Sequence, residues 1–541
     1  MVVPAELEKT LMIDTPVFGS AAVAAPHTLA SEVGRAVLAE GGNAIEAMVA
    51  MAATISVVYP HMNAIGGDGF WLVHQPGGKV HAIEACGPAG ALATIERYRE
   101  KGHDTIPSRG PDSALTVAGA IGGWEAALSL SKTLGGRMPL KDLLADAIRH
   151  CTEGYEISPS ELRTWPQQVE AVKEAPGFSE FFWPGGEQPK PGAHRKPDAL
   201  GATFRQLADA GLSDFYRGDI GREIAADLDA IGAPVTRADM EAYQARLVQP
   251  LSIRLPGLTV YNCAPPTQGV AALLILGIFE KLAIARAEGF DHHHGLVEAT
   301  KRAFAIRDRI VTDPAFATVD PMSVLTDAVF TREAAAIDRK RAASWPFKTG
   351  DGDTVWMGAI DGSGLAVSYI QSIYWEYGSG CILPRTGINW QNRGVSFSLD
   401  AKALNPLQPG RKPFHTLNPA FAGFDDGRIM SYGAMGGDGQ PQFQAQILSR
   451  YRFGQSPAEA VDAPRWLFGR TWGAGSISLK LESRFDPMLL ARLTGSGHPV
   501  EEYSESYSDQ FGHAGMLVKH PKGHVEATHD PRSDGDARGC S

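Results

Sequence analysis

Residues 352–361 read GDTVWMGAID, and they are the most informative stretch of the chain. The stretch leaves a Gly/Asp turn and enters an apolar, β-prone run about two-thirds of the way along the sequence. A cut between Asp353 and Thr354 would place a threonine at the N-terminus of a strand. Such a threonine carries a hydroxyl nucleophile and its own α-amine, a base with a pKa of about 8. The stretch therefore predicts a self-cleaving precursor whose nucleophile is Thr354.

The composition is that of an ordinary globular protein. Of the 541 residues, 44% are hydrophobic and 21% are charged, and the formal net charge is -11. The acidic balance and the lack of a dense Lys/Arg run argue against a nucleic-acid partner. No apolar run reaches the roughly 18 residues of a membrane span, so we expect no membrane partner either.

Cysteine usage and the first residues bear on the compartment. The N-terminal residues lack a basic region followed by an apolar one, so we expect no signal peptide. The cysteines are scattered without a CxxC pair, at Cys86, Cys151, Cys263, Cys381 and Cys540. This spacing predicts reduced thiols rather than a disulfide framework or a zinc site. We therefore expect a cytoplasmic protein with no metal and no cofactor.

The pattern along the chain predicts a helix-rich first part and a strand-rich last part that meet at about residue 353. Two Ala-rich helices are expected between Thr28 and Val58, separated by a glycine turn after which Asn43 caps the second helix. Further predictions are a hairpin of strands at 70–74 and 79–84, a mostly helical region at 125–345, and an apolar helix at about 269–285. Later strands are expected up to about residue 399 and near 428–433, 476–481 and 512–527.

The segment YGAMGGDG, residues 432–439, follows a predicted strand and precedes a predicted helix at 442–451. Its consecutive glycines let two backbone N–H groups approach a substrate oxygen, as an oxyanion hole requires. The same glycines would also suit a phosphate at a helix N-terminus, or simply a tight turn. The spacing matches neither the dinucleotide fingerprint nor the P-loop, which argues against a nucleotide site.

Other polar motifs are interpreted as structural. The run His292-His293-His294 suggests a metal, but adjacent residues on a helix point in different directions, so we interpret it as a solvated helix start. Along the same helix, Glu298 with Lys301/Arg302, and Arg307-Asp308-Arg309, are expected to form surface ion pairs. The glycine-flanked Ser379 lacks the GxSxG frame, which disfavours a serine hydrolase.

Taken together, short motifs along nearly the whole chain resemble the gamma-glutamyltransferase (gamma-glutamyltranspeptidase) family of N-terminal-nucleophile hydrolases. In chain order these motifs are GGNAIEA (41–47), GGDGF (66–70), VAG (117–119), GGW (122–124), PPTQG (265–269), KRAF (301–304), GDT (352–354), GI (387–388), KPF (412–414), MGG (435–437) and DPRSDG (530–535).

The resemblance implies an α+β fold, a four-layer αββα sandwich that is made as one precursor and cleaves itself between Asp353 and Thr354. Residues 1–353 would be a helix-rich large subunit and residues 354–541 a strand-rich small subunit. Together they would form one structural domain, associated as a heterodimer or as a dimer of such heterodimers.

The resemblance also implies roles for individual residues. The hydroxyl of Thr354 would attack an amide carbonyl while the α-amine moves the proton. The N–H groups of Gly436 and Gly437 would stabilise the oxyanion, and Ser372 would supply a second hydroxyl that supports the nucleophile.

The substrate pocket departs from the family's pattern. Members that act on γ-glutamyl groups bind the α-carboxylate with an Arg and two Ser, and the matching positions here are Cys86, His415 and Thr416. They bind the α-amine with Asn, Gln and Asp, and the matching positions here are Tyr374, Arg393 and Ser396. An ammonium group does not fit beside an arginine, so the charge pattern of a γ-glutamyl site is inverted.

This inverted set predicts an anion site, since Arg393 presents a rigid fork suited to a carboxylate. The structural alternative is that Arg393 forms an ion pair with Glu376 or Asp400. Together with YPHMN at residues 59–63, the set resembles the oxamate amidohydrolase branch of the family, whose substrate is a small amide that bears a carboxylate.

The sequence therefore predicts a cofactor-free amidohydrolase that acts on a small oxamate-like amide. One alternative is a gamma-glutamyl hydrolase or transferase acting on glutathione-type substrates, and another is a glutaryl- or cephalosporin-type acylase. A non-catalytic binding protein that uses the same fold is the alternative outside the enzymes.

Overall fold

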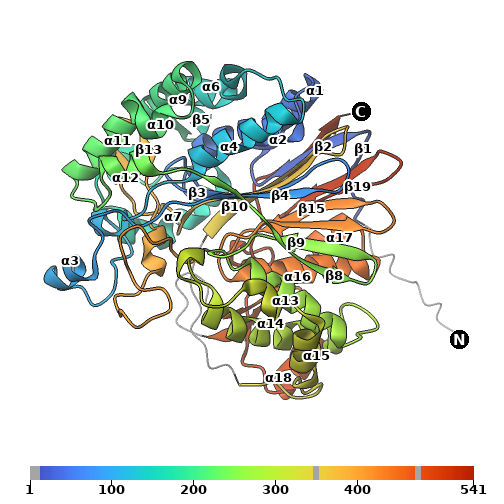
Figure 1. Ribbon diagram of the computed structural model, residues 1–541. Coiled ribbons are helices and arrows are strands. Elements are labelled where there is room, and N and C mark those ends of the chain that lie inside the picture. The colour runs from blue at the N-terminus through green and yellow to red at the C-terminus, as the bar shows by residue number, and fades with distance from the viewer. Residues whose placement is uncertain (1–12, 345–352, 470–476, 541) are drawn as a thin grey trace, which may run out of the picture.

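The computed structural model describes residues 13–344, 353–469 and 477–540. Two seven-stranded antiparallel sheets occupy the middle of the molecule (Figure 1). The first sheet has the order β1 (Val17–Phe18), β20 (Val525–His529), β19 (Ala514–Lys519), β15 (Ile429–Ala434), β14 (Ala420–Phe424), β9 (Leu258–Asn262) and β8 (Leu251–Leu255). The second has the order β21 (Asp536–Cys540), β2 (Ala21–Ala25), β10 (Asp353–Ile360), β11 (Ala366–Tyr374), β3 (Asp68–His74), β4 (Val80–Ala85) and β7 (Arg246–Val248).

Helices cover the outer face of each sheet (Figure 1). Over the second sheet lie α1 (Thr28–Ala39), α2 (Ala44–Val58), α4 (Ala120–Thr133), α6 (Ala145–Glu153), α9 (Asp198–Ala210) and α11 (Asp219–Ala230). Over the first lie α13 (Gly269–Lys281), α14 (Phe290–Ile310), α15 (Asp327–Ala335), α16 (Gly439–Arg452), α17 (Pro457–Asp462) and α18 (Pro487–Gly495).

Three apolar layers hold the four layers of structure together. The layer between the two sheets contains Phe70, Trp356, Phe421 and Leu517, all of them buried. Separate apolar clusters join each sheet to its covering helices. This arrangement confirms the predicted α+β sandwich of the αββα type, in which both sheets are buried on both faces.

The strand that begins at Asp353 lies in the middle of the second sheet. It pairs with β2 on one side and with β11 on the other, and β11 in turn pairs with β3. Both sheets therefore combine strands from before and after residue 353. Because β10 is central, its apolar run is covered on both faces, which explains why it is nearly continuous in sequence.

Several local predictions are confirmed. Helices α1 and α2 are separated by Gly41, whose φ of 90° is the left-handed conformation that glycine favours. Asn43 caps α2 through the backbone N–H groups of Ile45 and Glu46, and the Glu46 carboxylate returns a capping-box bond. Strands β3 and β4 form the expected hairpin.

Element ends differ by a few residues from the predictions. The apolar helix α13 ends at Lys281, and α16 begins at Gly439, so that only Asp438 separates it from the glycine pair. The first twelve residues, which lack a signal-peptide pattern, lie outside the described residues. None of the helices within the described ranges is both long and apolar enough to cross a membrane.

Candidate active site

Thr354 lies at an irregularity in the pairing of β10 with β11. Asp353 is opposite Tyr374 and Val355 is opposite Gln371, so two residues of β11, Ser372 and Ile373, face the single Thr354. An irregularity of this kind redirects a side chain away from the regular alternation of a strand. The Thr354 side chain is buried, with 1% exposure.

The hydroxyl of Thr354 belongs to a short chain of polar contacts. Its Oγ1 lies 3.3 Å from Oγ of Ser372, to which it donates, and it accepts a bond from Nε2 of Gln440 at 3.3 Å. Ser372 also accepts from the backbone N–H of Tyr374 at 2.8 Å. Tyr374 has a φ of 85°, a strained value for a residue with a side chain, of the sort that clusters at functional sites. The structure thus brings the predicted nucleophile and its predicted supporting hydroxyl together.

The predicted oxyanion glycines lie between β15 and α16. Gly436 and Gly437 have φ values of 117° and 53°, so both need the conformational freedom of glycine. Within the described part of the chain, no oxygen accepts a hydrogen bond from the N–H of either residue. Gln440 connects this loop to the nucleophile, because its own N–H donates to the carbonyl of Gly437 at 3.2 Å. Two unengaged N–H groups in a loop that Gln440 joins to the hydroxyl of Thr354 favour the oxyanion interpretation over a plain turn.

One buried amide fixes the position of this loop relative to the rest of the site. Nε2 of Gln268 donates to the carbonyls of Gly437 and Thr416, each at 2.9 Å. Its Oε1 accepts from Nη1 of Arg307 at 2.7 Å, and the same nitrogen lies 2.9 Å from Oδ1 of Asp438. Gln268 therefore joins the glycine loop to the segment that carries Thr416.

Arg393 forms the centre of the predicted anion site. Its side chain is 1% exposed, its Nη1 donates to Oγ1 of Thr416 at 3.2 Å, and its Cζ lies 3.8 Å from the ring centroid of Tyr374. Within the described residues, its Nη2 has no hydrogen-bond partner. Burial lowers the pKa of Arg393 to about 10, which leaves the guanidinium charged at neutral pH.

The structural alternative for Arg393 is not observed. No ion pair joins Arg393 to Glu376 or Asp400 in the described part of the chain, and Asp400 is exposed. The carboxylate whose charge acts on Arg393 is instead that of Asp68. The fork of Arg393 thus has a nitrogen left over for a ligand.

His415 lies beside this guanidinium and is completely buried. Its ring packs edge-on against Phe70, with centroids 5.0 Å apart. Among the described residues, neither ring nitrogen has a hydrogen-bond partner. Burial, followed by the charges of Arg393 and Lys412, holds the pKa of His415 well below its usual range, so the ring is neutral.

Asp68 is a site residue that sequence reasoning did not select. Its Oδ1 accepts from the N–H groups of Gly87 at 3.3 Å and Gly119 at 3.0 Å, and from Nε2 of Gln391 at 3.2 Å. Its Oδ2 lies 3.5 Å from Nε2 of His415. Burial raises the pKa of Asp68 to about 7, although Arg393 acts in the opposite direction. The sequence feature that could have indicated Asp68 is its position as the acidic residue inside the glycine turn at 66–69.

Sequence reasoning also did not select Gln440. The sequence feature that could have indicated it is a polar residue in the first helical turn after the glycine pair.

Of the predicted pocket residues, the structure brings Tyr374, Arg393, Thr416 and His415 together. Ser396 lies differently, because its hydroxyl is 3.1 Å from the carbonyl of Arg393 and 3.0 Å from that of Phe414. It stabilises the backbone that carries Arg393 and directs no group at the anion site.

Cys86 lies in the apolar layer between the sheets. Burial raises the pKa of its thiol well above the usual range, so the position contributes no charge to the site. The position that carries an arginine in γ-glutamyl enzymes is therefore neutral here.

The prediction of a solvated histidine run was wrong. His292, His293 and His294 are buried at the start of α14, where their rings pack against Phe279 of α13, Phe485, and Phe290 of the same helix, respectively. The nearby carboxylates already have cationic partners: Arg450 pairs with Glu288, and Lys301 pairs with Glu298 at 2.7 Å. These cations disfavour a metal both at the group of Glu288, His292 and His293 and at the group of His294, Glu298 and His498.

The expected surface ion pairs of α14 were also partly wrong. Glu298 and Lys301 form a buried pair, and Arg307 is 2% exposed. Arg307 forms ion pairs with Asp308 and with Asp438, the residue after Gly437, so it stabilises the end of the glycine loop. Helix α14 packs against α13, α15, α16 and α18, which buries polar side chains that the sequence pattern alone placed on the surface.

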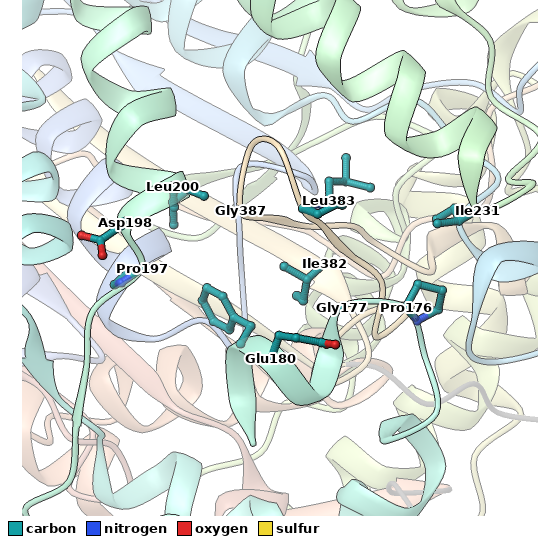
Figure 2. Close-up of a pocket in the computed structure, with 13 residues that line it drawn as sticks. Pro176, Gly177, Glu180, Pro197, Asp198, Leu200, Ile231, Ile382, Leu383 and Gly387 are labelled. Carbon is teal, nitrogen blue, oxygen red and sulfur yellow. The ribbon is translucent and has the colours of Figure 1, made fainter. Parts of the chain in front are cut away.

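A separate pocket of about 430 Å³ lies between the α8 (Phe178–Phe182) region and the start of α9 (Figure 2). Its lining is mostly apolar and includes Pro176, Leu200, Ile382 and Leu383. None of the candidate catalytic or anion-binding residues lines it. We therefore do not assign the reaction to this pocket.

A four-layer αββα sandwich with a buried threonine hydroxyl at the start of a central strand defines the class of N-terminal-nucleophile amide hydrolases. Residues 30–540 match the sequence profile of the family described as Gamma-glutamyltranspeptidase, and the chain belongs to this family. It is an amide hydrolase of that class.

Comparison with individual proteins agrees with this assignment. The chain is 51% identical to the Oxamate amidohydrolase proenzyme of Klebsiella pneumoniae subsp. pneumoniae, over 95% of this chain and 97% of that protein. It is 37% identical to the Glutathione hydrolase-like YwrD proenzyme of Bacillus subtilis, over 96% and 98%. The cephalosporin acylase of Bacillus halodurans has a similar structure, with a TM-score of 0.90 and 31% identity, over 100% of this chain and 99% of that one.

Proposed function

We propose that this chain is an autoprocessing N-terminal-threonine amidohydrolase whose substrate is a small amide that bears a carboxylate, such as oxamate. The observation that carries this proposal is the buried Arg393, which is charged, contacts Thr416 and Tyr374 and has Nη2 available for a ligand. The 51% identity to an oxamate amidohydrolase proenzyme supports the same substrate class.

Maturation by cleavage between Asp353 and Thr354 is part of the proposal. In the uncut chain the nitrogen of Thr354 is an amide, which cannot serve as a base, and cleavage converts it into an amine. Of the 541 residues, 353 form the first fragment and the remaining 188 the second. The fragments stay associated as a heterodimer because each sheet contains strands of both.

The reaction follows from the arrangement of the groups. The α-amine of Thr354 takes the hydroxyl proton while Oγ1 attacks the amide carbonyl, and Ser372 holds the hydroxyl in place. The N–H groups of Gly436 and Gly437 stabilise the oxyanion. The amine then gives its proton to the leaving nitrogen, which departs as ammonia, and water hydrolyses the acyl-enzyme. With oxamate the products are oxalate and ammonia.

The anion site selects the substrate by charge. A carboxylate pairs with the fork of Arg393 and has the hydroxyl of Thr416 and the ring of His415 beside it. The ammonium of a γ-glutamyl group would lie against the same guanidinium, which disfavours glutathione-type substrates. The neutral Cys86 does not offer an alternative carboxylate partner.

A glutaryl- or cephalosporin-type acylase is the second candidate, and the likeness to the Bacillus halodurans acylase favours it. A glutaryl amide also bears a carboxylate, at a greater distance from the scissile bond. The buried position of Arg393 and Tyr374 favours the smaller substrate over this one.

A substrate comparison with purified, matured enzyme tests the proposal. We expect ammonia release from oxamate, and little or no turnover of a γ-glutamyl anilide or a glutaryl anilide. Preferred turnover of either anilide would reject the oxamate-like assignment in favour of that alternative.

Denaturing electrophoresis with N-terminal sequencing tests the nucleophile. The wild type is expected to give two fragments, the smaller beginning Thr-Val-Trp, whereas Thr354→Ala stays intact and inactive. Thr354→Ser is the matched control, since it keeps a hydroxyl and is expected to cleave. An active wild type that remains a single chain would contradict the maturation step.

We also propose that the enzyme works in a reducing compartment, as expected of a cytoplasmic protein. All five cysteines are free thiols, and four of them are buried. Cell fractionation tests the location, and sedimentation of the matured enzyme distinguishes one heterodimer from a dimer of heterodimers.

A further inference from the structure

Three buried polar groups lie together in the candidate anion site, where Asp68 is paired with Ser372, the neighbour of the candidate nucleophile. Each has an unused hydrogen-bonding atom among the described residues. They are Oδ2 of Asp68, Nη2 of Arg393 and both ring nitrogens of His415. Oδ2 of Asp68 and Nε2 of His415 are only 3.5 Å apart, yet no hydrogen bond joins them. A neutral imidazole nitrogen and a carboxylate oxygen at this spacing have room for one shared proton.

The charges in this pocket do not allow a simple binding of an anion. If Asp68 is ionised, its charge already balances that of Arg393, and both groups are completely buried. A substrate carboxylate would then bring an uncompensated negative charge into a site from which water is excluded. One proton added to the pair of Asp68 and His415 restores neutrality.

We propose, on the basis of the proposed carboxylate-amide function, that the site takes up one proton with each substrate carboxylate and that Asp68 binds this proton, held between its Oδ2 and Nε2 of His415. The proton enters from solvent when the carboxylate pairs with Arg393, and it returns to solvent when the product leaves. No bond of the substrate changes in this step.

The carboxylate of Asp68 is well placed for this role. Oδ1 receives three hydrogen bonds and is fixed, which leaves Oδ2 as the oxygen that can carry the proton toward His415. Asparagine at this position would reproduce the protonated form. Its oxygen would accept the same three bonds, and its nitrogen would donate to the neutral ring.

The other groups around Asp68 do not replace it as the binding site for this proton. The phenols that face it and the thiol are kept neutral by burial, which raises the pKa of Tyr216, Tyr243, Tyr369 and Cys86. Beyond the thiol, Lys412 pairs with Glu84, and the carboxylate of Asp313 accepts from the backbone N–H of Lys412. The remaining group is the freed α-amine of Thr354, and a variant must separate its titration from that of Asp68.

Because carboxylate binding is coupled to protonation of Asp68, the affinity for the carboxylate should decrease as the pH rises. Burial raises the pKa of Asp68 to about 7 in the free enzyme, and a bound carboxylate raises it further. Below this pH the proton is already present, and binding is independent of pH. Above it, each unit of pH makes the proton ten times scarcer, so KM for oxamate increases about tenfold per unit.

The experiment measures KM for oxamate and the inhibition constant of propionate, an unreactive monocarboxylate, from pH 6 to 9. For the matured wild type, we expect both constants to increase above about pH 7. For Asp68→Asn we expect both to be independent of pH, so that at pH 9 the variant binds propionate about 100-fold more tightly than the wild type. Asp227→Asn, which alters a buried carboxylate paired with Arg385, is the matched control and should keep the wild-type slope.

Two results would overturn the proposal. One is a flat profile for the wild type. The other is an unchanged slope in Asp68→Asn, which would assign the titration to the α-amine of Thr354. Should Asp68→Asn fail to fold, proton uptake on adding propionate to unbuffered wild type at pH 8 decides the question: about one proton per site supports the proposal, and none rejects it. Failure to hydrolyse oxamate at any pH would instead reject the proposed function, which the propionate measurements do not require.

Discussion

Gln440 donates a hydrogen bond from Nε2 to Oγ1 of Thr354 across 3.3 Å, and it does so from the first turn of α16. Its backbone N–H reaches the carbonyl of Gly437, and its Oε1 accepts from the N–H of Asn418 at 3.1 Å. One residue therefore links the candidate nucleophile to the candidate oxyanion loop. The distance between these two functional parts is held by a helix end rather than by a flexible loop.

Replacing Gln440 should reduce the rate of the chemical step. Gln440→Ala removes one neutral hydrogen bond to the nucleophile, worth about 1 kcal/mol, so we expect kcat to fall roughly fivefold to tenfold. KM should change little, because Gln440 has no contact with Arg393. Steady-state kinetics with oxamate measure both constants. Gln446→Ala is the control, since Gln446 bonds to the backbone of Trp466 and should affect only the melting temperature. Equal losses of kcat in both variants would contradict a positioning role for Gln440.

The glycine loop should not tolerate a side chain. In Gly436→Ala the alanine would have to adopt a φ of 117°, and its Cβ would lie 2.9 Å from the ring of Phe443. The resulting shift displaces an oxyanion donor, so we expect kcat to fall by roughly 10²- to 10³-fold. Gly427→Ala is the control, because Gly427 also has a positive φ, of 88°, but lies in the turn between β14 and β15. The activity of this variant should remain near that of the wild type. Comparable activity of the two variants would argue against the oxyanion role.

Arg393 should control the affinity for the carboxylate. Arg393→Ala removes a charged hydrogen-bonding partner worth about 1.5–3 kcal/mol, so KM for oxamate should increase roughly 10- to 150-fold. Self-cleavage should continue, because Arg393 does not contact Thr354. Arg393→Lys keeps the charge but loses the forked guanidinium, so its KM for oxamate should lie between those of the wild type and Arg393→Ala. Arg254→Ala, which removes an exposed arginine paired with Asp425, serves as the control. An unchanged KM in Arg393→Ala would exclude the anion site.

A buried ion-pair network should make stability depend on pH. Asp530 is completely buried between Arg465 and Arg532, whose charges hold its pKa below the usual range. Because the folded pKa lies below the unfolded one, this stabilisation is present above about pH 4 and is lost as the pH falls further. Asp530→Asn should lower the unfolding free energy at pH 7 by about 3–5 kcal/mol.

Urea unfolding of the uncleaved Thr354→Ala chain, with and without Asp530→Asn, measures this effect on a single polypeptide. The difference between the two chains should be largest at pH 7 and smaller at pH 3. Asp425→Asn, an exposed carboxylate, should change stability by less than about 0.5 kcal/mol. A difference that grows as the pH falls would contradict the assigned direction.

The local pattern predicted much of the fold. The glycine turn and Asn43 separated α1 from α2 correctly, because capping is decided by a few adjacent residues. The turn at 75–79 likewise predicted the β3–β4 hairpin. The same reasoning failed for His292 and Lys301. Their polar side chains suggested a solvated face, but α14 is packed against other elements on that face. Burial of a polar face depends on partners that are distant in sequence, so local periodicity does not report it.

Local sequence placed Thr354 at the start of a strand and Gly436 and Gly437 shortly after a later strand, and the structure confirms both positions. The cut before Thr354 stays a prediction. Each of these depends on neighbours within about ten residues. Which residues meet in the candidate anion site was decided only by the tertiary structure. Asp68 belongs to a glycine turn, Arg393 to a short helical turn and His415 to an extended segment, and the pairing of β3 with β11 and the bridge between Thr267 and His415 bring them together. Their protonation states depend on this shared, buried environment, because burial raises the pKa of Asp68 and keeps His415 neutral. Neither effect can be deduced from the residues next to them in sequence.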